Sequence, residues 1–167
     1  MSKVLGIDPG LDGALVLVRS DVRHNGSQIT AFCDMPTIDV VIGGRAKRRI
    51  DPVALVDWLV GCGQVDLVVL EEVASSPQMG VASSFAFGEG YGLIQGILTT
   101  LQRSYQLVRP QVWCKELGVV RDKGRHRQMA SRLYPSDTGL FTRVKDNGRA
   151  DAALLATYGA RHLVRAA

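Results

Sequence analysis

The segment Val65–Leu70 constrains the fold more than any other part of the chain, because all but one of its residues are apolar. A β-rich run of this length, without polar residues in alternation, is typical of a strand that is covered on both faces. Cover on both faces usually comes from helices that pack on either side of an α/β sheet. We therefore expect a central strand here, in a sheet flanked by helices on both faces.

Four further segments have the pattern of strands in the same sheet. Lys3–Asp8 is an apolar strand that ends at the turn residues Pro9-Gly10. Ala14–Arg19 follows at once, and so short a connection favours antiparallel pairing with the first strand. Gln28–Cys33 and Tyr105–Val108 are the remaining candidates. The sequence thus predicts a mixed five-stranded sheet.

The expected helices fall between and after these strands. Asp51 is a good N-cap, Pro52 suits the first helical position, and Gly61 ends this helix. From Phe87 to Leu101 the apolar residues recur at steps of three and four, which predicts an amphipathic helix. Further helices are expected at Gln111–Leu117, Asp122–Leu133 and Arg149–Val164, with a loop over Pro135–Lys145. No repeat or linker interrupts this order, so we expect a single domain over residues 1–167.

Acidic residues stand where the predicted strands end. Asp8 ends the first strand, Glu71 and Glu72 end the central strand, and Asp151 lies in the first turn of the last helix. If the two strands are neighbours, these acids meet at one edge of the sheet. Crowded acids repel each other and lose hydration, and a divalent cation removes that cost. Oxygen ligands suit Mg²⁺ or Mn²⁺, and two such ions about 4 Å apart can support phosphodiester cleavage.

Each acid also has an ordinary structural explanation. Asp8 can start the turn at Pro9, and Asp151 can favour the helix dipole near an N-terminus. Only one of the adjacent glutamates can face a site, because strand side chains alternate. Asp146 is placed to cap a helix. Their joint occurrence at strand ends is less expected by chance than any one of them.

Basic residues are clustered in two places. The chain has 20 Lys and Arg against 16 Asp and Glu, which gives a net charge of +4. The clusters are Arg45–Arg49 and Arg121–Arg127. Such clusters can neutralise nucleic-acid phosphates, although a solvated basic loop is an equal alternative for each.

Other side-chain patterns are less informative. The histidines His24, His126 and His162 are scattered, and none has a sequence partner that suggests a nucleophile and base. Three cysteines lack metal-ligand spacing, and no apolar run is long enough to span a bilayer. We therefore expect a reduced protein of the cytoplasm without a signal peptide or a membrane partner.

Three motifs in chain order resemble the RuvC-type Holliday junction resolvases: Gly6-Ile7-Asp8-Pro9-Gly10, Leu70-Glu71-Glu72-Val73 and Arg149-Ala150-Asp151-Ala152. The stretches Phe87–Gly92, Pro110–Trp113 and Asp146–Ala152 resemble the smaller bacteriophage-type members. The resemblance implies an RNase H-like fold and a Mg²⁺-dependent endonuclease with two ions per active site, for which Mn²⁺ should substitute. It also implies symmetric nicks in four-way DNA junctions.

By this resemblance Asp8, Glu71 and Asp151 are catalytic metal ligands, and Lys123 is a basic residue near the scissile phosphate. Glu71 is chosen over Glu72 because one residue and then a valine follow it. Cellular family members carry another aspartate three positions before the last one, where this chain has Gly148. Asp146 is the obvious substitute as a catalytic metal ligand.

The remaining expectations concern DNA and a second subunit. Arg45, Lys47, Arg48 and Arg49 should hold the arms of branched DNA, with Arg125 as a further contact. Two symmetric nicks imply a homodimer. The glycine stripe, which comprises Gly88, Gly92 and Gly96, is either the seam of that dimer or a tight contact with this chain's own sheet.

One family feature has no direct match. Cellular members carry an aromatic residue that engages the junction centre, in the loop that corresponds here to Ala74–Met79. Met79 or Phe85 could wedge between bases, but we expect Phe85 to belong to the core.

Three other functions compete with a resolvase. The first motif also resembles a phosphate loop of actin-like and Hsp70-like ATPases, but those enzymes need two lobes and 167 residues supply one. A broader flap, branched-DNA or RNase H-type nuclease on the same fold is the closest alternative. A catalytically silent junction-binding protein would keep the basic clusters and need no acids.

Overall fold

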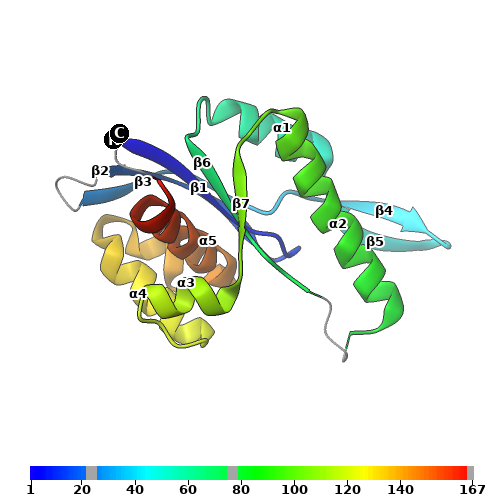
Figure 1. Ribbon diagram of the computed structural model, residues 1–167. Helices are drawn as coiled ribbons and strands as arrows, with labels where there is room; N and C mark the ends of the chain where they lie inside the picture. Colours follow the sequence, from blue (N-terminus) through cyan, green and yellow to red (C-terminus); the bar gives the residue numbers. More distant parts are fainter. Residues whose placement is uncertain (22–25, 75–78, 165–167) are drawn as a thin grey trace.

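The computed structural model describes residues 1–21, 26–74 and 79–164 (Figure 1). The strands are β1 (Ser2–Asp8), β2 (Ala14–Asp21), β3 (Gly26–Asp34), β4 (Thr37–Ile42), β5 (Arg45–Ile50), β6 (Leu67–Glu71) and β7 (Tyr105–Val108). The helices are α1 (Pro52–Gly61), α2 (Val81–Thr100), α3 (Pro110–Glu116), α4 (Lys123–Leu133) and α5 (Asn147–Tyr158). Within these ranges, no helix has the length and apolar character that a membrane crossing requires.

The main sheet has five strands in the order β3-β2-β1-β6-β7. The β1–β2 and β2–β3 pairs are antiparallel because short connections join them, whereas β1–β6 and β6–β7 are parallel. The predicted mixed five-stranded sheet is therefore confirmed.

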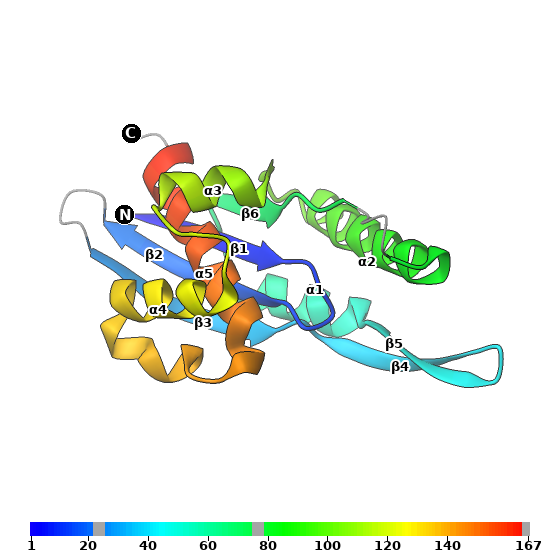
Figure 2. The ribbon, with the colours of Figure 1, turned by 90° about the horizontal axis from the view of Figure 1, so that it is seen from below.

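Helices cover both faces of this sheet, as expected (Figures 1 and 2). In β1, Leu5 and Ile7 belong to the core that includes α1 and α2, whereas Val4 belongs to the core built around α5. Gly6 shares the face of Val4, and a Cβ atom there would lie 2.0 Å from the carbonyl oxygen of Ala152. Only glycine allows this approach, which brings α5 directly against β1.

A second, two-stranded sheet was not predicted. β4 and β5 pair antiparallel from Thr37↔Ile50 to Ile42↔Arg45, and Gly43 and Gly44 form the turn with φ of 59° and 74°. Two glycines between strand-like segments are a hairpin signal. The hairpin projects beyond the main sheet on the same side as the N-terminal half of α2 (Figure 2).

The remaining differences between the expected and the observed structure lie in the second half of the chain. The expected loop Pro135–Lys145 contains 3₁₀ helices at Pro135–Phe141 and Val144–Asp146. The last helix begins at Asn147, and a π-helical turn continues it through Leu163. The expected core position of Phe85 is wrong: its side chain is 75% exposed, because this half of α2 extends past the sheet. Part of the loop Ala74–Met79 lies outside the described residues.

Candidate active site

Two acids meet where β1 and β6 end. Ile7 pairs with Leu70, so Asp8 and Glu71 follow side by side at the carboxyl ends of two parallel strands. Glu71 shares the face of Val69, which packs in the core around α5, and Asp8 shares the face of Gly6. Glu72 instead pairs with Arg109, whose Nε lies 3.1 Å from Oε1 of Glu72. The alternation of strand side chains thus directs Asp8 and Glu71 toward α5.

The third acid, Asp151, comes from α5 and is 1% exposed. One carboxylate oxygen, Oδ1, lies 2.7 Å from Nδ1 of His126, and the other contacts Nζ of Lys123. Lys123 and His126 are three residues apart in α4, so they share one side of that helix. Helix α4 therefore places two nitrogen groups against Asp151 of α5.

A buried tryptophan holds Glu71. Nε1 of Trp113, in α3, donates a hydrogen bond to Oε1 of Glu71 at 3.0 Å. The indole also meets the ring of His126 edge-on, with 4.9 Å between the ring centroids. Trp113 and His126, which are in contact, thus each hydrogen-bond one of the acids, Glu71 and Asp151.

The electrostatics of these acids favour a cation. Burial raises the pKa of Asp8 to about 6, and the charge of Asp151 adds to this rise. Burial also raises the pKa of Glu71 to about 7, with a further contribution from Asp8. Burial disfavours charge on Lys123, but Asp151, Asp8 and Glu71 outweigh this effect and raise the pKa of its ammonium group. Lys123 therefore supplies part of the positive charge that the three acids require.

The donor chemistry fits a hard divalent ion, since all three acids offer oxygen ligands. Over the part of the chain that the structure describes, however, no group of three acidic, histidine or cysteine side chains is arranged to coordinate one ion. Asp151 is engaged by Lys123 and His126, and Glu71 by Trp113. Coordination of Mg²⁺ or Mn²⁺ would require Lys123 to leave the Asp151 oxygen that it contacts.

Asp146 has different partners. Its Oδ2 accepts from the backbone N–H of Arg143 at 2.8 Å, and its Oδ1 lies 2.8 Å from Nη2 of the same residue. Arg149 adds a contact at 3.6 Å. The hydrogen bonds from Arg143 lower the pKa of Asp146. Its role as a metal ligand stays a prediction, and that role would require these ion pairs to open.

Gly148 stands where the resemblance implies an aspartate, and its surroundings leave no room for a side chain. A Cβ atom at Gly148 would lie 2.5 Å from the carbonyl oxygen of Asp12 and 2.7 Å from Cα of Gly13. The start of α5 packs so closely on the β1–β2 turn that no side chain fits there. An aspartate at this position would therefore overlap the backbone of the β1–β2 turn.

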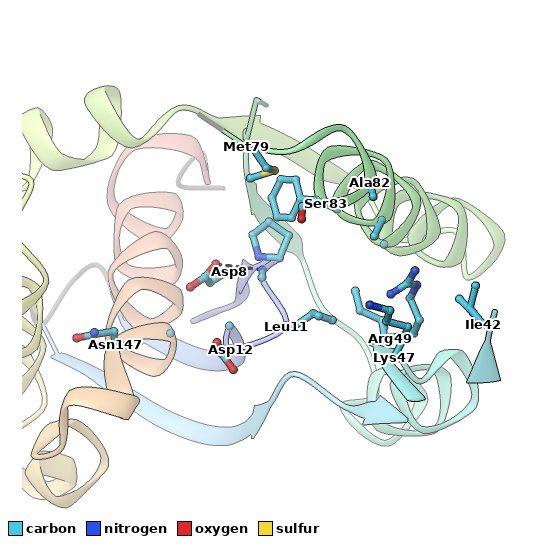
Figure 3. A pocket seen from close by; sticks show the side chains of 18 of the residues that line it. Asp8, Leu11, Asp12, Ile42, Lys47, Arg49, Met79, Ala82, Ser83 and Asn147 are labelled. Atoms are coloured by element: carbon cyan, nitrogen blue, oxygen red, sulfur yellow. Dashed lines mark hydrogen bonds between the residues drawn. The ribbon is translucent and has the colours of Figure 1, made fainter. Parts of the chain in front are cut away.

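A groove of about 770 Å³ leads away from Asp8 (Figure 3). Its floor is the Pro9–Gly13 turn between β1 and β2. The walls come from the β4–β5 hairpin, with Ile42, Lys47 and Arg49, and from α2, with residues that include Ala82, Ser83 and Phe87. Lys123 also lines the groove, so cations stand both beside Asp8 and on the hairpin.

The basic residues expected to hold DNA occupy three settings. Arg45 and Lys47 are exposed on the hairpin, and Arg125 is exposed on α4. Nη2 of Arg48 lies 2.5 Å from Oδ1 of Asp12, and Nε of Arg49 lies 3.2 Å from Oε2 of Glu89. Arg48 and Arg49 thus have acidic partners within the chain, and they attach the hairpin to the β1–β2 turn and to α2.

Sequence patterns did not single out His126 or the role of Trp113. The spacing of three between Lys123 and His126 was the available signal, because it places both on one side of a helix. Nothing in the sequence shows that this side faces Asp151. That contact joins residues 25 positions apart.

Comparisons with solved structures identify the fold. Thermus thermophilus RuvC, in complex with a Holliday junction substrate, matches with a TM-score of 0.60 and 15% identity over 96% of each chain. The yeast mitochondrial Holliday junction resolvase matches with a TM-score of 0.66 and 14% identity over 96% of this chain and 78% of its own. The fowlpox virus Holliday junction resolvase matches with a TM-score of 0.55 and 16% identity over 96% of this chain and 99% of its own.

Sequence comparisons add no family assignment. No sequence profile of a known family matches the chain, and no curated protein matches it significantly. The chain therefore has the RNase H-like fold of RuvC and of other Holliday junction resolvases, at low sequence identity.

Proposed function

We propose that this chain is a Holliday junction resolvase, a metal-dependent endonuclease that makes symmetric nicks in four-way DNA junctions. The observation that carries the proposal is the meeting of Asp8, Glu71 and Asp151 beside Lys123, at the strand ends of a resolvase fold. Two of the matching structures, from Thermus thermophilus and fowlpox virus, contain Holliday junction DNA. The proposal includes one nuclease domain that acts in the cytoplasm.

Asp8, Glu71 and Asp151 would hold Mg²⁺, or Mn²⁺ in its place, with two ions per active site and Asp146 as a further ligand. Ions bound there would lower the pKa of a water molecule and stabilise charge on the leaving oxygen. The chain's own side chains contribute by orienting the carboxylates that would bind the ions. Trp113 and His126 each hold one carboxylate, Glu71 and Asp151, by a hydrogen bond, and ion binding would in addition require Lys123 to leave Asp151.

Lys123 is suited to a contact with the scissile phosphate. Its side chain is 58% exposed although its ammonium group reaches the buried Asp151. Its raised pKa keeps it charged at neutral pH. Once a bound metal ion neutralises Asp151, the ammonium group of Lys123 would be free to bind a phosphate oxygen in the groove beside Asp8.

For the DNA arms, we assign contacts to Arg45, Lys47 and Arg125, which are exposed. Arg48 and Arg49 would contribute from the base of the hairpin while they remain near Asp12 and Glu89. All five are cations that can neutralise phosphates, and two of them, Lys47 and Arg49, line the groove.

A homodimer is supported by the glycine stripe on α2. A Cβ atom at Gly88, Gly92 or Gly96 would meet nothing within 4 Å, so the stripe does not pack against this chain's own sheet. That alternative is therefore wrong. Phe85, on the same helix, is also exposed. We propose that α2 of a second copy packs along this stripe, because small residues permit close helix approach.

The test compares the chain with its Asp8→Asn variant on a labelled mobile four-way junction and on a linear duplex of the same sequence. With Mg²⁺ we expect paired symmetric nicks in the junction alone, and at least about 10³-fold slower cleavage by the variant, because several kcal/mol of charge stabilisation are removed. Metal-dependent cleavage of flaps or RNA–DNA hybrids instead would indicate the broader nuclease. Tight junction binding without cleavage in Mg²⁺ or Mn²⁺ would indicate a silent binding protein.

A further inference from the structure

The β4–β5 hairpin ends in an apolar tip that the proposed chemistry does not use. We define the hairpin tip as Val41–Arg45. Val41 is 77% exposed and Ile42 is 49% exposed, and the two-glycine turn follows them. Apolar side chains at the end of a projecting arm are typical of a contact surface. The hairpin tip is therefore a candidate contact surface.

The base of the hairpin is fixed to the rest of the molecule. Arg48 is paired with Asp12 and Arg49 with Glu89. Ile50, at the end of β5, is buried and lies against Gly90 of α2, where a Cβ atom would be 3.2 Å from its Cδ1. An arm that is held at its base keeps its tip in a defined place, which a wedge or a contact surface requires.

The hairpin tip and the candidate active site belong to one continuous surface. Ile42 and Asp8 both line the groove, and they stand at opposite sides of it in Figure 3. Lys47 and Arg49 lie on the hairpin wall between them. A strand of nucleic acid that passed the hairpin tip would meet these cations before it reached Asp8 and Lys123.

We propose that the hairpin tip separates strands at the junction centre. Val41 and Ile42 insert between base pairs at the branch point, while Arg45 and Lys47 bind the phosphates beside them. The groove then leads the unpaired strand to Asp8. Apolar wedges that unstack bases are an established mode of DNA binding. This inference rests on the proposed resolvase function and assigns the opening of the junction to a hairpin outside the five-stranded sheet.

Charge favours DNA over a second copy of this chain as the partner of the tip. Arg45 and Lys47 are exposed next to the apolar pair. Two tips packed together would bring four like charges close to one another, which is unfavourable, whereas phosphates complement them. Phe85 is a rival wedge, but it lies one helical turn from Gly88, on the side of α2 that we assign to the dimer.

The experiment measures unstacking directly. A four-way junction carries 2-aminopurine beside the branch point, and its fluorescence is recorded on binding in EDTA, so that no cleavage occurs. Four proteins are compared: the unmodified chain, Val41→Ser/Ile42→Ser, Phe85→Ser, and Val60→Ser as the matched control. Val60 is 56% exposed on α1, so its replacement removes a similar exposed side chain from another surface. Oligomeric state is measured for each by sedimentation.

We expect the unmodified chain, Phe85→Ser and Val60→Ser to raise the fluorescence. The double tip variant should bind the junction and keep the oligomeric state but lose this increase. Full fluorescence with the tip variant, or loss of the increase with a Phe85→Ser protein that keeps its oligomeric state, would overturn the inference. Conversion of the tip variant to monomers would instead identify the tip as a contact between copies and would also overturn it. Junction cleavage by the unmodified chain in Mg²⁺ tests the proposed function separately.

Discussion

Nδ1 of His126 lies 2.7 Å from Oδ1 of Asp151, and its Nε2 lies 3.1 Å from the carbonyl oxygen of Val120. The ring is thus held at both nitrogens by oxygen acceptors, and it is 5% exposed. The hydrogen bond from this fixed ring occupies Oδ1 of Asp151. The other oxygen, Oδ2, contacts Lys123, which a metal ion could replace. Histidine therefore orients the acid that α5 contributes.

Replacing His126 by phenylalanine keeps an aromatic ring but removes the hydrogen bond to Asp151. We expect a loss of about 10- to 100-fold in Mn²⁺ affinity and in junction cleavage, the usual cost of removing such an outer partner. Mn²⁺ binding by electron paramagnetic resonance measures the first effect without relying on activity. His162→Phe is the control, since His162 stacks on Tyr158 in the π-helical turn. An unchanged Mn²⁺ affinity of His126→Phe would show that His126 does not orient Asp151 for metal binding.

The raised pKa values of Asp8, about 6, and Glu71, about 7, predict how stability depends on pH in EDTA. An acid with a raised pKa in the folded state holds its proton more tightly when folded. Its stabilising effect is complete below the ordinary pKa values of 3.8 and 4.5 and disappears as pH rises through 6 to 7. Two pKa units correspond to about 3 kcal/mol before solvent screening reduces them.

We therefore expect the melting temperature of the unmodified chain in EDTA to fall between pH 5 and pH 8. The fall should exceed that of the Asp8→Asn/Glu71→Gln variant by on the order of 5 °C. Mg²⁺ should stabilise the unmodified chain more at pH 8 than at pH 5, because it neutralises acids that are charged only at the higher pH. Thermal unfolding followed by circular dichroism at both values measures this. Equal stabilisation at the two pH values would argue against metal binding by these acids.

Gly92→Leu should prevent dimer formation. A leucine side chain in the centre of the glycine stripe would hold a second helix away, although the single chain has room for it. We expect monomers in sedimentation and little junction cleavage, with the unfolding temperature nearly unchanged. Gly61→Leu, at another open position on α1, is the matched control. An active dimeric Gly92→Leu protein would show that the dimer forms elsewhere.

Salt dependence separates the two pairs of hairpin cations. Arg45→Ala/Lys47→Ala should weaken junction binding and reduce the slope of log K against log salt by about one for each phosphate that the variant no longer neutralises. Arg48→Ala/Arg49→Ala should reduce the slope less, because Asp12 and Glu89 already neutralise these cations. Titrations of a junction at several salt concentrations provide the slopes. The opposite order would make Arg48 and Arg49 the principal residues that bind phosphate.

Gly148→Asp, which introduces the aspartate of cellular resolvases, should destabilise the chain. Its Cβ atom alone would overlap the backbone of Asp12 and Gly13, and overpacking of this kind costs about 1–3 kcal/mol or more. Denaturant unfolding measures the loss, and Gly148→Ala should share most of it. A Gly148→Asp protein of normal stability would mean that α5 can move away from the turn.

Local sequence determined most of the elements and placed the acids at the strand ends. Turn residues, caps and apolar spacing are properties of neighbouring residues, so β1, β2 and α1 are predictable within a few positions, whereas α2 begins at Val81, six residues before the expected Phe87. The strand ends also placed Asp8 and the pair Glu71 and Glu72, and alternation allowed only one of the two glutamates to face a site, while the choice of Glu71 came from the family resemblance. The Gly43-Gly44 turn is also a local signal, although the hairpin that it closes was not predicted.

Only the tertiary structure decided which groups the acids meet. His126 contacts Asp151 across 25 positions of the sequence, and Trp113 contacts Glu71 across 42. Both contacts depend on the packing of α3, α4 and α5. The partners of Asp146, the open face of the glycine stripe and the exposure of Phe85 likewise depend on where each helix extends relative to the sheet. Spacing along one element fixes which of its residues share a side. What that side faces depends on long-range packing, which short-range periodicity does not encode.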